Sequence, residues 1–320
     1  MKRKMIVSIA QLTGGQRERI LAAAERQGVE ALFLDREEDA LQALDGAEIL
    51  FSQSAALARH APSLRWQCTP SAGVDHFLAP GTFAGPEVLL SNSSGAYGVT
   101  IAEHVIMVTL EILRRQQDYT EITARREWRR DLPVCSIRGS RILMMGTGDI
   151  GQEAALRLRA FSPASLLGLN RSGRNPAQRF DRILLPEDLE KVLPETDLLI
   201  LSLPDTPETR GVLDQKRLAL LPDGAVIVNV GRGSAIHQGA LEKELRAGRL
   251  SAALDVFEKE PLPQQDPMWD CPNLLLTPHV AGNMTLPYTL ERIVELFLED
   301  FENYCAGRPL CRAVNPQKGY

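Results

Sequence analysis

The stretch RILMMGTGDIGQEAALRLRAF, residues 141–161, decides the fold of this 320-residue chain. A short apolar run leads into GTGDIG, and a pattern typical of an amphipathic helix follows directly. Gly146 permits a tight turn, Gly148 lets the backbone approach a pyrophosphate, and Gly151 allows close packing of helix on strand. The helix N-terminus offers N–H groups to the phosphates. A purely structural turn is the alternative, but a strand before GxGxxG and a helix after it favour a dinucleotide site.

Apolar runs alternate with helical patterns along the whole chain. On the amino-terminal side MIVSIA precedes QRERILAAAERQG, ALFLD precedes EDALQALDGA, and EILF precedes SAALARHAP. A loop-rich zone (70–94) and a long helix (99–115) follow. The alternation restarts at residue 141 and continues through LLGL, ILL, LLILSL, AVIVNV, AALDVF and LLLTPH. Such runs are typical of parallel strands that are covered on both faces.

The alternation therefore predicts an α/β fold of two doubly wound parallel-sheet domains. We expect residues 98–286 to form the dinucleotide-binding domain and residues 1–97 and 287–320 to form the other domain. A last helix, over 286–305, would have to return to cover the first domain. A length of 320 residues is consistent with about two domains.

The composition excludes several classes of protein. Hydrophobic residues make up 44% and charged residues 24%, which is ordinary globular usage, and a net charge of −5 favours neither nucleic acid nor a membrane surface. The five cysteines form no CxxC, so we predict neither a metal site nor a disulfide framework. ARREWRR (124–130) could meet a polyanion, but we interpret it as the solvated face of a helix. No apolar run suits a signal peptide or a membrane span, so we expect a cytoplasmic protein.

The next apolar run ends in GLNRSGR, residues 168–174, where a ribose-binding acid is usually found. Here the position is Asn170, 19 residues past Gly151. An acid would repel a 2′-phosphate, whereas Asn170 does not, and Arg171 and Ser172 could contact a phosphate. We interpret the segment as a preference for NADPH, with NADH possible. The alternative is that the arginines are ordinary surface charges and that Asn170 serves NAD.

Three reactive side chains follow later strands. Arg232 stands in NVGRGS, Glu260 in AALDVFEKEPLP and His279 in LLLTPHVAGN. Ligands of open α/β sheets bind outside the carboxyl ends of the strands, so these three side chains could converge there. Each alone has an ordinary structural explanation, but together they favour a catalytic site.

The chain resembles the D-isomer-specific 2-hydroxyacid dehydrogenase family over essentially its whole length. The motifs that carry the resemblance are PSAGVDHF (70–77), SNSSGAYGVTIAEHV (91–105), MGTGDIG (145–151), PETRGVLDQKRLALLPDGAVIVNVGRGS (207–234), LDVFEKEPLP (254–263) and NLLLTPHVAG (273–282). The resemblance implies a Rossmann cofactor domain inserted into a flavodoxin-like substrate domain, and a homodimer. Glutamate at 260 argues against the formate-oxidising branch, which has an amide there.

The resemblance also implies a role for each site residue. Arg232 would bind the carboxylate and carbonyl of a 2-keto acid, Glu260 would be the acid beside the imidazole, and His279 would donate the proton. Hydride addition builds negative charge on the carbonyl oxygen, so a cation and a proton donor belong there. The substrate would also contact Ser71, Ala72 and Gly73. The predicted cofactor contacts are Gly146, Gly148, Asp149, Ile150, Gly151, Asn170, Arg171, Ser172, Pro204, Thr209 and Asp255.

The predicted function is NADPH-dependent reduction of a small 2-keto acid, of the glyoxylate or hydroxypyruvate type, to a D-2-hydroxy acid. A nucleotide-sensing binding protein like the transcriptional co-repressors that resemble this family is the alternative. The substrate's side-chain pocket would be formed by residues 51–55, 71–75 and Tyr97, with Trp128 and Trp269 as candidate wall residues.

Overall fold

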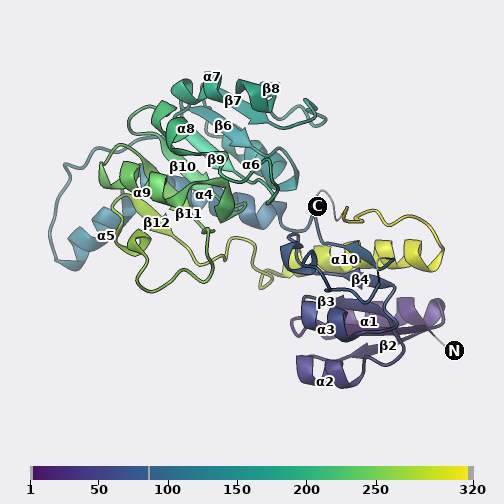
Figure 1. Cartoon of the computed structure of the whole chain (residues 1–320). Helices are drawn as coiled ribbons and strands as arrows, with labels where there is room; N and C mark the ends of the chain where they lie inside the picture. Colours follow the sequence, from purple (N-terminus) through teal and green to yellow (C-terminus); the bar gives the residue numbers. More distant parts are fainter. Residues whose placement is uncertain (1–2, 86, 316–320) are drawn as a thin grey trace. The chain divides into compact units, whose positions relative to one another are not determined.

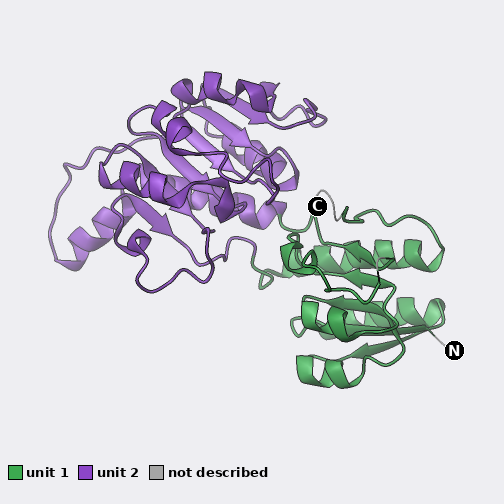
Figure 2. Ribbon diagram, viewed as in Figure 1, with its two compact units in different colours: residues 1–97, 283–320 green, residues 98–282 purple. Residues whose placement is uncertain are grey.

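A computed structural model describes residues 3–85 and 87–315, and the chain divides into two compact units (Figure 2). Unit 1 comprises residues 1–97 and 283–320, and unit 2 comprises residues 98–282. The segment 283–286, which leads into the last helix, groups with unit 1. The expected bounds of the dinucleotide-binding domain, residues 98–286, stay a prediction.

Unit 1 contains a five-stranded parallel sheet in the order β2-β1-β3-β4-β5. Its strands are β1 (Arg3–Ser8), β2 (Val29–Phe33), β3 (Ala47–Ser52), β4 (Trp66–Cys68) and β5 (Leu89–Ser91). The chain moves outward from β1 to β2 and then crosses back to β3. Right-handed crossovers on either side of such a reversal put helices on both faces of the sheet.

The helices of unit 1 pack in pairs, α1 with α10 and α2 with α3. They are α1 (Gly14–Arg26), α2 (Glu37–Gln42), α3 (Ala55–His60) and α10 (Pro287–Cys305), with a short 3₁₀ turn η1 (Asp75–Phe77). Helix α10 belongs to this unit because its apolar face packs on the sheet. Phe297 stacks on Phe51 of β3 with ring centroids 4.0 Å apart. The ring centroid of Trp66 of β4 lies 5.6 Å from that of Phe297.

Two strands of unit 1 were not among the expected ones. β4 is buried throughout, and β5 lies inside the zone that the sequence predicted to be loop-rich. Each has only three residues, too few to show a period. The edge of β5 is covered by the carboxyl-terminal segment, where Ser91 forms an antiparallel bridge with Ala313.

Unit 2 contains a seven-stranded parallel sheet in the order β12-β11-β10-β9-β6-β7-β8 (Figure 1). Its strands are β6 (Arg141–Met145), β7 (Ser165–Leu169), β8 (Arg182–Leu184), β9 (Leu198–Leu201), β10 (Val226–Asn229), β11 (Ser251–Leu254) and β12 (Leu274–Leu276). The strand order reverses between β6 and β9, and an open α/β sheet binds its ligand outside the strand ends at that reversal. All residues of β9 and β10 are buried, as continuous apolar runs predict.

Helices cover this sheet, and α4 packs on α6 and against β10 and β11. The helical elements of unit 2 are α4 (Gly98–Leu113), α5 (Gln116–Ala124), α6 (Asp149–Arg159), η2 (Pro186–Asp188), α7 (Leu189–Val192), η3 (Leu193–Glu195), α8 (Gln215–Leu220), η4 (Gly233–Ala235), α9 (Gln238–Arg246) and η5 (Pro267–Asp270). The two all-parallel sheets confirm the predicted α/β fold of two doubly wound domains.

The interpretation of ARREWRR as a helix face is wrong. Helix α5 ends at Ala124, and Arg126 has a φ of +59°, which ends helical geometry. The segment is solvated but irregular, and it pairs its own charges, Arg125 with Glu127 at 2.8 Å and Arg129 with Asp131 at 2.9 Å. Within residues 3–85 and 87–315, no helix has the length and apolar character needed to cross a membrane, and no three His, Cys, Asp or Glu side chains gather as metal ligands would.

Candidate active site

The glycine-rich turn between β6 and α6 lies at the reversal of strand order. Gly146 has a φ of +94°, and a Cβ there would lie 2.6 Å from the carbonyl oxygen of Ser202. A Cβ on Gly151 would lie 2.2 Å from the carbonyl oxygen of Gly146. Around Gly148, in contrast, no heavy atom of the described residues lies within 4 Å of a Cβ position. Two glycines therefore close the turn and the third leaves space in front of it, which fits a bound pyrophosphate.

Helix α6 begins at Asp149 directly after this turn, and its N-cap residue is Gly148, which has no side chain to bond the first N–H groups. Its first N–H groups can therefore serve an anion. The carboxylate of Asp149 lies against Gly98, the first residue of α4, where a Cβ would stand 2.5 Å from Oδ2. Ile150 is the next residue of α6 and is partly buried. The turn and the helix end both fit a dinucleotide.

Asn170 organises the loop after β7 through both ends of its amide. Its Oδ1 accepts hydrogen bonds from the backbone N–H groups of Ser172 (3.0 Å) and Gly173 (2.7 Å). Its Nδ2 donates to Oγ1 of Thr147 in the glycine-rich turn at 2.7 Å and to the carbonyl oxygen of Arg174 at 3.0 Å. An aspartate would keep the acceptor and lose both donors. Asn170 therefore joins the loop that carries Arg171 to the glycine-rich turn.

The segment after β9 lies near the same loop. Oγ1 of Thr209 donates to the carbonyl oxygen of Pro204 at 2.6 Å and accepts from the N–H of Thr206 at 2.9 Å, so it closes a compact turn. The pKa of Glu208 is lowered chiefly by hydrogen bonding to Thr206 and further by the positive charge of Arg171.

The structure brings His279 and Glu260 into direct contact. Nδ1 of His279 lies 2.6 Å from Oε2 of Glu260, and Oε1 of Glu260 accepts from the N–H of Phe257 at 2.9 Å. The two side chains come from the loops after β12 and β11, which are neighbours in the sheet. Both are partly exposed, 51% for His279 and 35% for Glu260. The carboxylate thus orients the ring and leaves Nε2 as the nitrogen that can exchange a proton with a ligand.

Arg232 stands in the loop after β10, next in the sheet to β11. A Cβ on Gly231 would lie 2.5 Å from the N atom of Leu203, and a Cβ on Gly233 would lie 1.9 Å from the carbonyl carbon of Phe257. Asn229, 1% exposed, donates Nδ2 to the carbonyl oxygen of Arg232 at 3.0 Å. The two glycines therefore let the Arg232 loop lie against both neighbouring loops, one of which holds Glu260.

Asp255 follows β11 and is 3% exposed. Its oxygens accept from Oγ1 of Thr277 at 2.6 Å and from the N–H groups of Val280 (2.9 Å) and Ala281 (3.0 Å). The residue predicted as a cofactor contact is thus bonded to the segment that carries His279. Its contact with a cofactor stays a prediction.

Ser71, Ala72 and Gly73 lie in unit 1 on a turn after β4. Oγ of Ser71 donates to the carbonyl oxygen of Gly73 at 2.7 Å, and Nδ2 of Asn92 donates to the carbonyl oxygen of Ala72 at 2.7 Å. The hydroxyl of Tyr97 donates to the carbonyl oxygen of Pro70 at 2.7 Å. The N–H of Ser71 itself donates to Oγ1 of Thr69 at a long 3.4 Å, so the turn is held by its carbonyl oxygens and by this one N–H, and its contact with a substrate stays a prediction.

The two tryptophans proposed as pocket-wall residues are both exposed, and their place in a substrate pocket stays a prediction. Trp128 is 90% exposed, and Trp269 is 49% exposed with Nε1 donating to the carbonyl oxygen of Pro263 at 2.8 Å.

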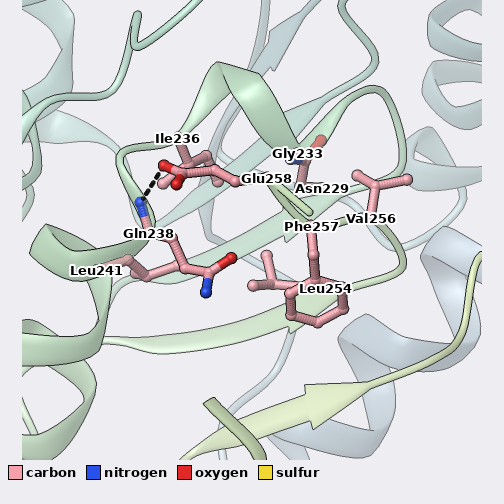
Figure 3. A pocket seen from close by; sticks show the side chains of 9 residues that line it. All are labelled: Asn229, Gly233, Ile236, Gln238, Leu241, Leu254, Val256, Phe257 and Glu258. Carbon is pink, nitrogen blue, oxygen red and sulfur yellow. Dashed lines mark hydrogen bonds between the residues drawn. The ribbon is translucent and has the colours of Figure 1, made fainter. Parts of the chain in front are cut away.

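A small cavity lies behind the Arg232 loop (Figure 3), lined by Asn229, Gly233, Ile236, Gln238, Leu241, Leu254, Val256, Phe257 and Glu258. Its volume of about 10 Å³ suits at most one water, so it is not a substrate site.

Sequence reasoning missed three residues that support the site. Thr277 bonds to the Asp255 carboxylate, His104 bonds to Thr277, and Asn229 holds the Arg232 loop. Thr277 and Asn229 each stand at a strand end next to a predicted catalytic residue, which is a usable signal. His104 lies on a helix 173 positions before Thr277 and gives none.

The chain is similar to several known proteins in sequence and in structure. The family model described as "D-isomer specific 2-hydroxyacid dehydrogenase, NAD binding domain" matches residues 106–281. Glyoxylate/hydroxypyruvate reductase B from Pectobacterium atrosepticum is 32% identical over 230 residues, which cover 70% of this chain and 71% of the relative. A 2-hydroxyacid dehydrogenase family protein from Aeromonas salmonicida has a similar structure, with a TM-score of 0.87, 32% identity, and coverage of 99% of this chain and 100% of that chain. The NADPH-dependent glyoxylate/hydroxypyruvate reductase from Sinorhizobium meliloti, in complex with NADP and sulfate, has a TM-score of 0.81 at 31% identity and covers both chains fully, 100% of each.

Proposed function

The chain belongs to the D-isomer specific 2-hydroxyacid dehydrogenase family, and we propose that it reduces a small 2-keto acid, of the glyoxylate or hydroxypyruvate type, to a D-2-hydroxy acid. It is an NAD(P)-dependent dehydrogenase that uses NADPH, with NADH possible. The observation that carries the proposal is the 2.6 Å contact between His279 and Glu260 at the strand ends of a sheet whose reversal point holds the glycine-rich turn.

Each catalytic side chain has one task in this proposal. Bound NADPH supplies a hydride to the carbonyl carbon of the substrate. The guanidinium of Arg232 binds the substrate carboxylate and stabilises the charge that develops on the carbonyl oxygen. Nε2 of His279 donates a proton to that oxygen, so a carbonyl, a hydride and a proton give a hydroxyl. Glu260 fixes the ring through Nδ1 and stabilises its protonated form.

Substrate and cofactor contacts outside the triad are part of the same proposal. The N–H groups of Ser71, Ala72 and Gly73 would bind the substrate carboxylate. The turn from Gly146 to Gly151 and the N-terminus of α6 would bind the pyrophosphate, which the space in front of Gly148 supports. Arg171 and Ser172 would contact the 2′-phosphate, and the turn from Pro204 to Thr209 would lie beside the adenosine.

We also propose that the chain forms a homodimer through unit 2 and acts in the cytoplasm. Two features of unit 2 support the dimer. Trp128 is 90% exposed on an irregular segment, and an open apolar groove lies between α4 and α6 with Ile106, Met107 and Phe161 along it. Light scattering on the purified chain tests this proposal, since a monomer at micromolar concentration would contradict it.

The proposed activity is tested by following NADPH oxidation with a panel of 2-keto acids graded by side-chain size, each with NADPH and with NADH. We expect turnover with the smallest members, and chiral analysis of the product should give the D isomer. Tight NADPH binding without turnover of any 2-keto acid would contradict the proposed enzymatic activity and favour a nucleotide-sensing binding protein.

A further inference from the structure

His279 adopts a backbone conformation that its side chain disfavours. Its φ is +54°, in the left-handed region that a residue with a Cβ enters only at a cost in free energy. Its N–H donates to the carbonyl oxygens of Asp255 (2.9 Å) and Thr277 (3.1 Å). Because this conformation sets the direction in which the imidazole leaves the backbone, the surrounding contacts must hold it if Nδ1 is to meet Glu260.

Asp255 supplies the contacts on the far side of the turn. Its Oδ1 accepts from the N–H of Val280 and its Oδ2 from the N–H of Ala281, the two residues that follow His279. A carboxylate that is 3% exposed is costly unless hydrogen bonds satisfy it. The orientation of this carboxylate therefore fixes the backbone that directly follows His279.

A hydroxyl completes the bonding of Asp255. Oγ1 of Thr277 lies 2.6 Å from Oδ1 of Asp255 and, at a longer 3.4 Å, from Nε2 of His104 on α4. A hydroxyl has a single hydrogen, and a carboxylate can only accept, so Thr277 donates to Asp255 and accepts from His104. Burial lowers the pKa of His104, against the opposing effects of Asp255 and Glu111. A neutral imidazole with its hydrogen on Nε2 meets this requirement.

We propose that Thr277, supported by His104, is a positioning residue of the proposed reaction: its hydroxyl holds the Asp255 carboxylate in the orientation that keeps His279 in its left-handed turn and aims the imidazole at Glu260 and the substrate. The expected effect on kcat rests on the proposed function, whereas the positioning of His279 by this network does not. The hydroxyl touches neither of the reacting groups and acts through Asp255.

The test compares two substitutions at Thr277. Thr277→Val keeps the volume and removes the hydroxyl, whereas Thr277→Ser keeps the hydroxyl. We expect Thr277→Val to lower kcat by about 10-fold to 100-fold, since a small displacement of a catalytic group has an effect of that order. Thr277→Ser, which keeps the hydroxyl, should have a kcat within about threefold of the parent. Equal kcat for the valine and parent proteins would overturn the inference.

Thr109 provides the matched control. It lies on α4 like His104, is fully buried at 0% exposure, and its hydroxyl has no hydrogen-bond partner among the described residues. Thr109→Val removes the same group from the same unit without touching the Asp255 network. We expect its kcat to equal that of the parent. A loss of kcat as large as that of Thr277→Val would show that any buried threonine has this effect, and would overturn the inference.

A second readout does not depend on turnover. The Cε1–H resonance of His279, assigned by its absence in His279→Gln, should move in Thr277→Val and stay in place in Thr109→Val. If the parent reduces no 2-keto acid, the proposed function fails while this comparison still decides the positioning role. An unmoved resonance in Thr277→Val would overturn it.

His104→Phe covers the case in which Thr277→Val does not fold. The substitution removes the Nε2 donor and leaves the Thr277–Asp255 contact in place. We expect a smaller fall in kcat, about threefold to tenfold, with an unchanged melting temperature, because the 3.4 Å bond is the weaker of the two. An unchanged kcat in a folded His104→Phe protein would remove His104 from the inference.

Discussion

Nδ1 of His279 lies 2.6 Å from Oε2 of Glu260, and the second carboxylate oxygen of Glu260 is held at 2.9 Å by the N–H of Phe257. The imidazole therefore meets a carboxylate that the backbone has already oriented. Phe257 also adjoins Gly233, next to Arg232, so the loop that holds Glu260 contacts the arginine loop as well. One short segment after β11 thus contacts the loops of all three residues that we propose to be catalytic.

This contact predicts how His279→Ala affects the enzyme. The substitution removes the proton donor and leaves the glycine-rich turn unchanged. We expect kcat to fall by about 10²-fold to 10⁴-fold, the usual contribution of a general acid. The dissociation constant of NADPH, measured by fluorescence titration, should change little. Equal losses of rate and of NADPH affinity would reject the acid role.

Glu260→Gln tests the carboxylate itself. The amide keeps the size and an acceptor, but it removes the negative charge that stabilises the imidazolium. We expect the alkaline limb of the pH–rate profile for reduction to move to lower pH, so that activity is lost earlier as the pH rises. Rates measured across the pH range against the parent check this, and an identical profile would exclude Glu260 from the mechanism.

The parts that the sequence predicted best depend on local chemistry. Gly146 and Gly151 could be assigned because a strand, a glycine turn and a helix follow one another, and the close approaches of both residues match that assignment. Buried strands such as β10 could be predicted because apolar residues on both faces leave no other explanation. In contrast, β4 and β5 have three residues each, and only their neighbours in the sheet define them.

The candidate site also combines features with a local sequence signal and features that depend on contacts between distant segments. Arg232, Glu260 and His279 could be proposed from their places after successive strands, but the 2.6 Å contact depends on a left-handed residue that no pattern shows. The contribution of His104 depends on α4 packing against β11, a contact between segments far apart in the chain. The sequence predicted Asn170 as a cofactor contact because it lacks the usual negative charge. Its amide also forms the hydrogen bonds that hold the loop after β7, which the sequence did not predict.

Gly233→Ala is predicted to disrupt the site through packing alone. A Cβ at this position would lie 1.9 Å from a backbone carbon of Phe257, which cannot move aside as a side chain can. We expect a loss of stability of about 3 kcal/mol or more, together with loss of activity. Gly239→Ala on α9 is the control, because the nearest atom to its Cβ is 3.6 Å away and alanine favours a helix. Urea unfolding of both variants checks this; similar midpoints would contradict it.

Arg171→Ala tests the recognition of the 2′-phosphate. Removing a charged hydrogen-bond donor should raise KM for NADPH by about 10-fold or more, while KM for NADH stays nearly unchanged. The control is Arg182→Ala, at an exposed position of β8 in the same unit. Steady-state kinetics with both cofactors decide the question. Parallel increases in both KM values would refute phosphate recognition by Arg171.

Glu153 on α6 predicts a pH dependence of stability. Oε2 accepts from Arg157 at 2.6 Å and Oε1 from Arg179 at 3.1 Å, and these bonds, chiefly that of Arg157, hold the pKa of Glu153 below its ordinary value despite partial burial. The unfolded chain therefore binds this proton at a higher pH than the folded chain. The stability that Glu153 gains from its two arginines is fully present above the pKa that its carboxyl has in the unfolded chain. It is lost as the pH falls through the lower pKa of the same carboxyl in the folded chain.

Glu153→Gln should consequently lower the free energy of unfolding by about 1 kcal/mol near pH 7, the upper range for a partly exposed pair. The difference from the parent should shrink as the pH falls through the lowered pKa of the folded parent's own carboxylate. Thermal unfolding at several pH values measures this, with Glu302→Gln at an exposed position of α10 as the control. Because only a charge-dependent contribution disappears in acid, a difference that persists at low pH would assign the effect of Glu153 to packing instead.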